Sequence, residues 1–357
     1  MTAKLRSSIK AGLNSGLRKS ISGGVSATGL TYNITISGNT FALRSTGTVD
    51  YSVNWGDGSN ETSTSNTLSH TFADGSYSVV VVTTLGKFRP QINNNADGDR
   101  ITSIVIGARI NLGTTVQRAW KGASFMTSFE CPFHVTSDIV HFGEAWRSCS
   151  SLVSFPLIDT SGSTQFGNTW NGCHSLTSFP SLDVSNGTGF ANTWYDCRTL
   201  TSFPLLDVSS GTNFTTAWRG CSGLTSFPSL DVSSGTNFSN TWRQCSSLTS
   251  FPLLDVSSGK RFDSGWSTCT SLANFPANMF DTTGALASTA FNNTWGSCAL
   301  TAQSIENILV SLDTNGHSNI TLVISGGTNA AKTTWSTAAN TAYDNLITKG
   351  WTISFNA

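Results

Sequence analysis

Hydrophobic positions recur every 24 residues through the middle of this chain. Tryptophan marks the period from Trp146 to Trp266, and a phenylalanine followed by proline marks it from Phe155 to Phe275. The same interval separates the leucines from Leu152 to Leu272 and a second series of phenylalanines from Phe166 to Phe262. A fixed period of this length is typical of stacked coils, because one repeat alone cannot bury its hydrophobic face. We therefore expect a solenoid.

Each repeat divides into two legs. Apolar positions in 200–208 predict a short strand, and the proline after each phenylalanine limits its length because proline lacks a backbone donor. Ser209-Ser210-Gly211 predicts a turn. Phe214 and Trp218, four residues apart, predict a tight helical or irregular return leg.

Different patterns flank the repeats. Before them, hydrophobic and polar residues alternate from Leu30 to Ile36, from Val49 to Trp55 and from Tyr77 to Val81, which predicts half-buried strands. After residue 300 the apolar spacing becomes three to four residues. This spacing predicts helices near 305–312 and 335–346, with strands at 320–324 and 351–355. Such a helical end is expected to cap the stack.

Three resemblances follow from these segments. The repeat WRQCSSLTSFPLLDVSS at 242–258 resembles the unit of BspA-type leucine-rich-repeat surface proteins, with Trp242 where that family usually has Phe. This resemblance spans about residues 101–300 and implies a leucine-rich-repeat fold with an adhesive role and no catalysis. WGDGS at 55–59 with HTFADGSY at 70–77 resembles the PKD-type immunoglobulin-like domain. TAQSIENIL at 301–309 and KGWTISFNA at 349–357 resemble the C-terminal ends of tailed-phage structural and tail-fibre-like proteins.

The expected fold class is mainly β with short helices. It consists of a PKD/immunoglobulin-like β-sandwich, a 24-residue-repeat leucine-rich-repeat-like solenoid and an α/β C-terminal cap. The expected domains are a basic N-terminal anchoring leader at 1–24, the sandwich at 25–88, the solenoid at 89–300 and the cap at 301–357.

Composition narrows the possible partners. Charged residues make up 11% of the 357 residues and balance to a net charge of zero, so we expect no nucleic-acid partner. No apolar run is long enough to span a membrane, and we expect no membrane insertion. The basic N-terminus is not followed by the hydrophobic run of a secretory signal.

The leader is the expected docking element. Hydrophobic residues recur there every four positions among five basic side chains and no acidic one, as on an amphipathic helix. An unstructured tail without a role and a helix lying on a membrane surface are the alternatives. The partner-docking residues are expected to be Lys4, Leu5, Arg6, Ile9, Lys10, Leu13, Leu17 and Ile21.

Tryptophan and cysteine form two structural ladders three residues apart. Indole rings could form an exposed platform for sugars, but we expect them in the interior, with each indole N–H bonded to a carbonyl. Equivalent cysteines should be buried free thiols, since side chains in a parallel stack do not converge for disulfides or metal. The tryptophans are Trp146, Trp170, Trp194, Trp218, Trp242 and Trp266, and the cysteines are Cys149, Cys173, Cys197, Cys221, Cys245 and Cys269.

Carboxylates also recur, from Asp159 to Asp255. Acid–base catalysis needs two groups in unlike environments, which equivalent positions do not provide, so we expect Asx turns instead of catalytic residues. The segment from Asn93 to Gly98 is similar to the front half of a calcium loop, but Ile104 stands where such a loop has glutamate. We therefore expect no catalytic, metal or cofactor site.

These expectations favour a non-enzymatic phage virion structural protein, tail-associated and involved in host-surface binding. It would reach the virion surface after assembly in the host cytoplasm, in multiple copies. The leader would contact other virion proteins, and the solenoid would contact a host glycan or protein. Alternatives are a capsid decoration or head-fibre protein, a bacterial cell-surface adhesin and, in a different class, a polysaccharide-cleaving tailspike.

Overall fold

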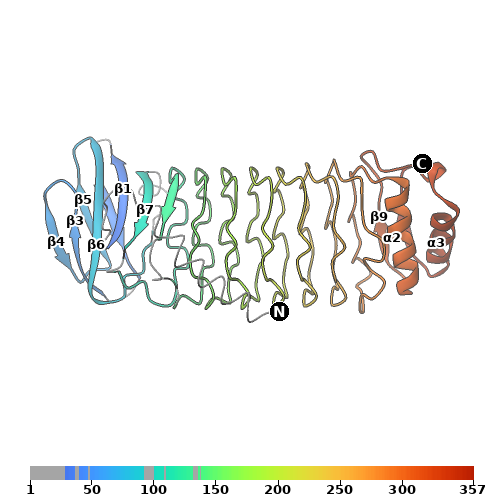
Figure 1. The fold of residues 1–357 in the computed structure, drawn as a ribbon, viewed down its shortest axis with the longest axis horizontal. Helices are drawn as coiled ribbons and strands as arrows, with labels where there is room; N and C mark the ends of the chain where they lie inside the picture. Colours follow the sequence, from blue (N-terminus) through green and yellow to red (C-terminus); the bar gives the residue numbers. More distant parts are fainter. Residues whose placement is uncertain are drawn as a thin grey trace.

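The computed structural model describes residues 29–36, 40–46, 49–91, 100–107, 110–131, 136 and 138–357. Over these residues the chain is mainly β, with two α-helices near the C-terminus. β-sheets lie at one end, a stack of coils forms the middle, and the helices close the other end (Figure 1). The expected leader (1–24) and the segment from Asn93 to Gly98, whose sequence is similar to the front half of a calcium loop, lie outside the described residues.

Two sheets pack together at the N-terminal end. Alternate residues of their strands, such as Tyr32, Ile34 and Val53, are buried between them, together with Trp55. The larger sheet has the order β4-β3-β6-β1-β7-β8, and β2 pairs with β5. The strands are β1 (Leu30–Ile36), β2 (Thr40–Arg44), β3 (Val49–Asn54), β4 (Asn60–Ser63), β5 (Thr67–Thr71), β6 (Gly75–Gly86), β7 (Ile101–Ile106) and β8 (Ser128–Glu130).

The larger sheet continues into the coils. β7 pairs with β1 and β8 pairs with β7, so one sheet crosses the expected boundary at residue 88. The Thr127 amide donates to Thr102 at 2.9 Å, and Val153 of the next coil donates to Thr127 at 3.3 Å. On this leg, the first coil is therefore joined to the larger sheet by β-sheet hydrogen bonds.

Backbone hydrogen bonds join the coils along the tryptophan leg. In the coils from Val116 to Thr268 four alternate amides donate to carbonyls of the following coil, and intervening amides bond within their own coil. This arrangement satisfies most backbone groups of the leg without a helix. In one coil the pairs are Phe190 to Asn213 (3.0 Å), Asn192 to Thr215 (2.9 Å), Trp194 to Ala217 (2.9 Å) and Asp196 to Arg219 (2.7 Å).

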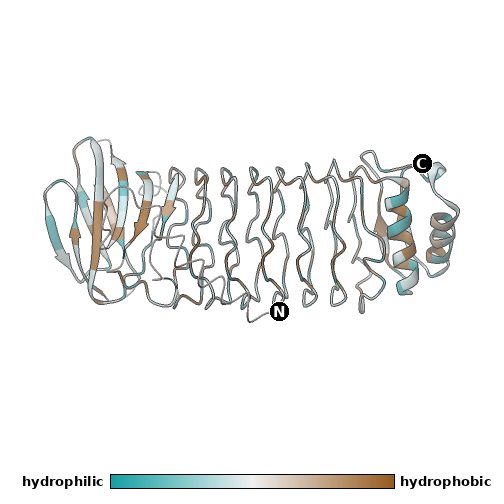
Figure 2. Ribbon diagram, viewed as in Figure 1, coloured by the Kyte–Doolittle hydropathy of each residue, from teal (hydrophilic) through white to brown (hydrophobic). Residues whose placement is uncertain are grey.

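The strand expected at 200–208 does not form as a regular element. Coil-to-coil bonds on this leg are sparse, such as Thr225 to Thr201 at 3.4 Å, and the isolated bridge found there joins Ser250 and Asn274. Pro204 has no amide hydrogen to donate, so the ladder stops beside it. Hydrophobic positions nonetheless recur in every coil along the stack (Figure 2).

Two residues in each coil have left-handed backbone geometry. They flank the tryptophan at two residues on either side, as Asn192 (φ 56°) and Asp196 (φ 63°) flank Trp194. Asn, Asp and Gly tolerate this region best and occupy several of these positions, but other residues such as Glu144 (φ 58°) and Thr216 (φ 56°) adopt it too.

Two helices and two short strands close the C-terminal end. They are α2 (Ala302–Asn315), β9 (Thr321–Val323), α3 (Thr337–Thr348) and β10 (Thr352–Ser354). α2 takes the place of a further coil: Ser304 Oγ accepts from the Phe275 amide at 2.9 Å, and Ser311 Oγ accepts from the Phe280 amide at 2.8 Å. The helix thus satisfies amides that the last coil would otherwise leave open.

Candidate functional site

The most regular exposed surface runs along the leg that carries the prolines. We call it the coil face and define it by three rows: Thr177 to Thr249, Pro156 to Pro276, and the residues that follow the prolines. In the third row Leu157, Leu205 and Leu253 are 41%, 70% and 55% exposed. The alternate coils carry Ser181 and Ser229 instead. The face therefore combines hydroxyl rows with an apolar projection in every second coil, an alternation that the sequence analysis missed.

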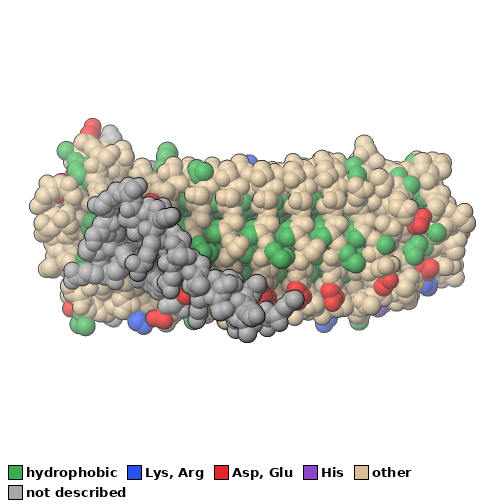
Figure 3. All heavy atoms as spheres, in the orientation of Figure 1, with side chains coloured by type: hydrophobic (Ala, Val, Ile, Leu, Met, Phe, Trp, Pro, Cys, Tyr) green, Lys and Arg blue, Asp and Glu red, His purple; other side chains and the backbone are tan. Residues whose placement is uncertain are grey.

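Figure 3 shows how these side-chain types are distributed over one side of the molecule. Hydrophobic side chains recur from coil to coil along the stack, and carboxylates gather toward one margin. Charge is therefore sparse over the middle of that side, which suits a ligand that is itself largely neutral.

The tryptophan ladder does not contribute to any exposed surface. Its six rings are completely buried and stack face to face, with neighbouring ring centroids 4.9–6.1 Å apart. Each ring also meets phenylalanines edge-on, as Trp218 meets Phe227 at 5.0 Å. An exposed sugar-stacking platform is therefore excluded at these positions.

The expectation that each indole N–H bonds to a carbonyl is wrong. The buried Nε1 atoms from Trp120 to Trp295 have no hydrogen-bond acceptor among the described residues. Aromatic neighbours surround each indole: in Trp218, one tryptophan covers each face. Burying these N–H groups costs free energy, which the stacking and apolar burial of the large rings must offset.

The cysteine thiols act as hydrogen-bond donors as well as small core residues. All eight cysteines are free and buried. The Sγ of Cys221 donates to the Trp194 carbonyl of the preceding coil at 3.1 Å, and equivalent bonds of 3.1–3.3 Å recur along the ladder. A thiol at this position therefore links adjacent coils, which valine or alanine could not do.

The thiols should be almost unreactive in the folded protein. Burial raises the pKa of Cys173, Cys221 and Cys298 to about 12, so almost no thiolate forms near neutral pH. We expect a thiol reagent to modify few cysteines in native protein and all eight after denaturation without a reductant. Rapid labelling of native protein, or fewer than eight thiols after denaturation, would contradict buried free thiols.

The recurring aspartates make turns, as expected. Asp207 Oδ1 accepts from the Ser209 amide at 3.2 Å and from its hydroxyl at 2.6 Å, and every repeat from Asp159 to Asp255 has the same Asx contact to the backbone. Among the described residues, no three His, Cys, Asp or Glu side chains come together as metal ligands. The aspartate row therefore has a structural explanation.

A charge cluster that the sequence analysis missed lies in the first two coils. Glu144 is 13% exposed and pairs with Arg118 at 2.8 Å, Lys121 at 2.7 Å and Arg147 at 3.0 Å. Burial raises the pKa of Glu144, but the hydrogen bonds from these three cations outweigh it and hold the pKa at about 2. The cluster joins two coils, since Arg118 and Lys121 precede Glu144 by one repeat.

Replacing Glu144 with Gln should make the protein less stable near neutral pH by about 1–2 kcal/mol, because three cations lose their carboxylate and two of them are largely exposed. The carboxylate stabilises the fold above its unfolded pKa of 4.5, and this contribution disappears as the pH falls toward about 2. Denaturant unfolding across this range should therefore show the two proteins converging in acid. A difference that is independent of pH would contradict this role.

Two histidines form surface clusters without catalytic geometry. His70 Nε2 lies 2.7 Å from Asp57 Oδ2 and 3.5 Å from Ser59 Oγ, so the carboxylate and the hydroxyl meet the same ring nitrogen, and the hydroxyl donates to Asp57 at 2.6 Å. His174 Nε2 lies 3.0 Å from Asp196 Oδ2, with no nucleophile in the contact. Neither arrangement is a nucleophile–base–acid relay.

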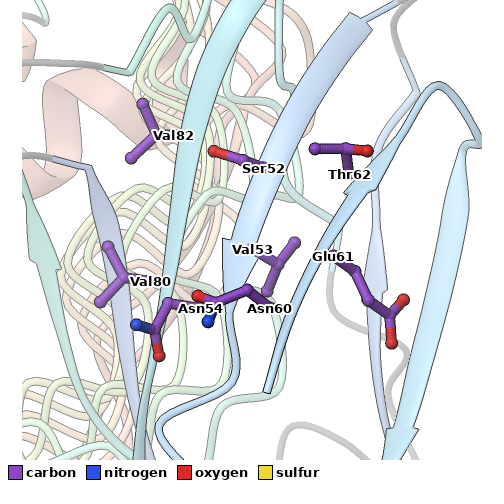
Figure 4. A pocket seen from close by; sticks show the side chains of 8 residues that line it. All are labelled: Ser52, Val53, Asn54, Asn60, Glu61, Thr62, Val80 and Val82. Atoms are coloured by element: carbon purple, nitrogen blue, oxygen red, sulfur yellow. The ribbon is translucent and has the colours of Figure 1, made fainter. Parts of the chain in front are cut away.

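A hollow of about 500 Å³ lies on the larger sheet (Figure 4). It is formed by side chains of β3, β4 and β6, and Glu61 is the only ionisable residue that lines it. Glu61 lies 4.0 Å from Nδ1 of His70, which does not line the hollow, so the lining itself does not provide an acid–base pair. This hollow is therefore a weaker candidate site than the coil face.

The comparisons with known proteins add no family assignment. Within the described residues, no helix has the length and apolarity needed to cross a bilayer. The expected docking residues from Lys4 to Ile21 lie outside the described part of the chain, so their placement stays a prediction. No family model, curated protein or solved structure matches this sequence.

Proposed function

We propose that this protein is a non-enzymatic structural component of a tailed-phage virion, tail-associated, whose coil face binds the host surface. The observation that carries the proposal is the coil face itself, where hydroxyl rows, prolines and projecting leucines repeat over successive coils. The apolar faces of sugar rings would pack against the prolines and leucines, and sugar hydroxyls would form hydrogen bonds with the threonines and serines. A host polysaccharide is therefore the proposed ligand.

We further propose that the two packed sheets are a PKD-like sandwich and that the coils are a leucine-rich-repeat-like solenoid. The support is the set of sequence motifs together with the parallel bridges between coils 24 residues apart, such as Gly189 to Asn213. In this arrangement the leader anchors the protein to other virion proteins, the sandwich is a spacer, and the solenoid extends outward. Immunogold labelling of virions should then place the protein on the particle surface.

Binding can be tested with an array of bacterial surface polysaccharides as the probe. The full chain should be retained on at least one polysaccharide and release no new reducing ends from it. A double variant, Leu205→Ser with Leu253→Ser, should lose binding by about tenfold, because two apolar contacts are removed. Serine already occupies these positions in the alternate coils, so the variant should fold normally.

Lys260→Ala is the matched control, since it removes an exposed side chain from the opposite leg. It should bind as the wild type does. Absence of binding to every polysaccharide, or equal binding by the double variant, would overturn the role of the coil face. Release of reducing ends would instead favour the tailspike enzyme.

A further inference from the structure

Three aromatic rings enclose a lysine ammonium in the C-terminal cap. Lys332 Nζ lies 3.4 Å from the ring centroid of Tyr343, 5.1 Å from that of Phe355 and 5.9 Å from that of Trp335. The rings also contact one another, with centroids 5.4–6.0 Å apart. We call these three rings the aromatic cage.

The charge of Lys332 is not balanced by an acid. No carboxylate of a described residue lies within ion-pair distance of its ammonium, whereas Lys349 in the same cap pairs with Asp313. The quadrupoles of the three aromatic rings therefore provide the electrostatic attraction for this cation.

The rings are held in place by contacts that do not involve the lysine side chain. Trp335 is 7% exposed, and its Nε1 donates to the Ala330 carbonyl at 3.3 Å. Tyr343 lies on α3, and Phe355 directly follows β10. Asn356, next to Phe355, is fixed by bonds of 2.8 Å to Gly326 and Asn329. The cage is therefore preformed, and Lys332 occupies it as a flexible side chain.

We propose that the aromatic cage is a binding site for a quaternary alkylammonium group, and that Lys332 is an internal competitor that such a ligand displaces. A cage without a carboxylate does not compensate a strongly hydrated cation, so it favours a quaternary ammonium, which loses little hydration. A free primary amine has the same chemistry as the tethered lysine but lacks its high effective concentration. The site lies in the cap, at the end of the molecule opposite the N-terminal sheets (Figure 1).

The first test uses the wild-type protein with isotope-labelled lysine. Ring currents of the cage should shift the Lys332 methylene resonances in NMR spectra, and Lys332→Ala identifies them by their loss. Adding choline should move these resonances toward their unperturbed positions. Two control compounds should leave these resonances unchanged at equal concentration. One is a neutral isostere of choline that carries a tert-butyl group, and the other is lysine amide blocked at its α-amino group, which presents a free side-chain amine. Resonances that do not respond to choline, or that respond equally to the neutral isostere, would overturn the proposal.

The second test measures the affinity for choline by calorimetry. Lys332→Ala should bind choline about tenfold more tightly than the wild type, because the tethered competitor is gone. Adding Tyr343→Leu to that variant should abolish binding, since the closest ring is lost. Lys260→Ala, the matched control, should bind as the wild type does. Equal affinity of the wild type and Lys332→Ala would mean that the lysine does not compete with choline, and it would contradict the proposal. This test uses no coil-face residue, so its outcome is independent of the proposed polysaccharide binding.

Discussion

Replacing Trp218 with Ala should lower the free energy of unfolding by about 3–5 kcal/mol, the usual cost of truncating a large buried aromatic side chain. The ring is fully buried and stacks on Trp194 at 5.2 Å and on Trp242 at 6.1 Å, so its loss weakens two coil interfaces. Because each coil contacts only its neighbours, unfolding should also become less cooperative, with the two halves of the stack separating. Denaturant unfolding followed by circular dichroism measures both effects.

Leu205→Ala is the control for the tryptophan variant. Leu205 is 70% exposed in a neighbouring segment of the stack, so its truncation should change stability by no more than about 0.5 kcal/mol. If Trp218→Ala unfolds like the wild type and loses polysaccharide binding instead, the placement of the tryptophan ladder in the interior is wrong.

Replacing Gly211 with Ala should cost about 2–3 kcal/mol, as overpacking of a tight core does. A Cβ at this position would lie 2.5 Å from Phe214 Cζ and 2.9 Å from the Val208 carbonyl oxygen. Both neighbours are constrained, since Phe214 stacks between two other phenylalanines. Thermal unfolding measures the loss.

An earlier coil shows how such a side chain is accommodated. Ser163 stands at the position equivalent to Gly211, and the adjacent phenylalanine rings, Phe142 and Phe166, are 6.1 Å apart instead of 5.4–5.6 Å. Gly172→Ser is the matched control: although Gly172 has φ 77°, its equivalent Ser148 has φ 62°, and a Cβ would meet no atom closer than 3.5 Å. If both variants were equally stable, the crowding at Gly211 would be refuted.

The 24-residue period identified the interior of the stack because burial repeats with the sequence. The backbone of the return leg was harder to predict, since hydrophobic spacing at Phe214 and Trp218 fits a helix as well as an irregular leg. Asn, Asp or Gly stands two residues from some of the tryptophans, as Asn192 and Asp196 do, which favours left-handed geometry, but Ser264 and Thr268 take the same geometry beside Trp266 without such a signal. The strand predicted at 200–208 was wrong, and the prolines explain why the hydrogen-bond ladder is interrupted there.

The candidate sites depended on contacts between residues far apart in the sequence. The Glu144 cluster requires the alignment of Arg118 one coil earlier, and their separation of 26 residues departs from the 24-residue period. The aromatic cage requires a lysine and rings from three separate elements of the cap. The alternation of Leu205 with Ser229 was present in the sequence, but only the exposed fraction of Leu205 shows that this alternation lies on the surface.

The direction of the hydrogen bonds along the tryptophan leg makes the two ends of the stack chemically unlike. The alternate amides on this leg that bond between coils point toward the C-terminal end, where the last of them donate from Trp295 and Ser297 to carbonyls of Val323 and Ser325. At the other end a carbonyl, that of Gln117, is met by the side chain of Gln91. An added or deleted repeat would leave both closures unchanged, and would lengthen or shorten the rod by about 5 Å. The number of repeats in the gene therefore sets the length of the stack in equal steps.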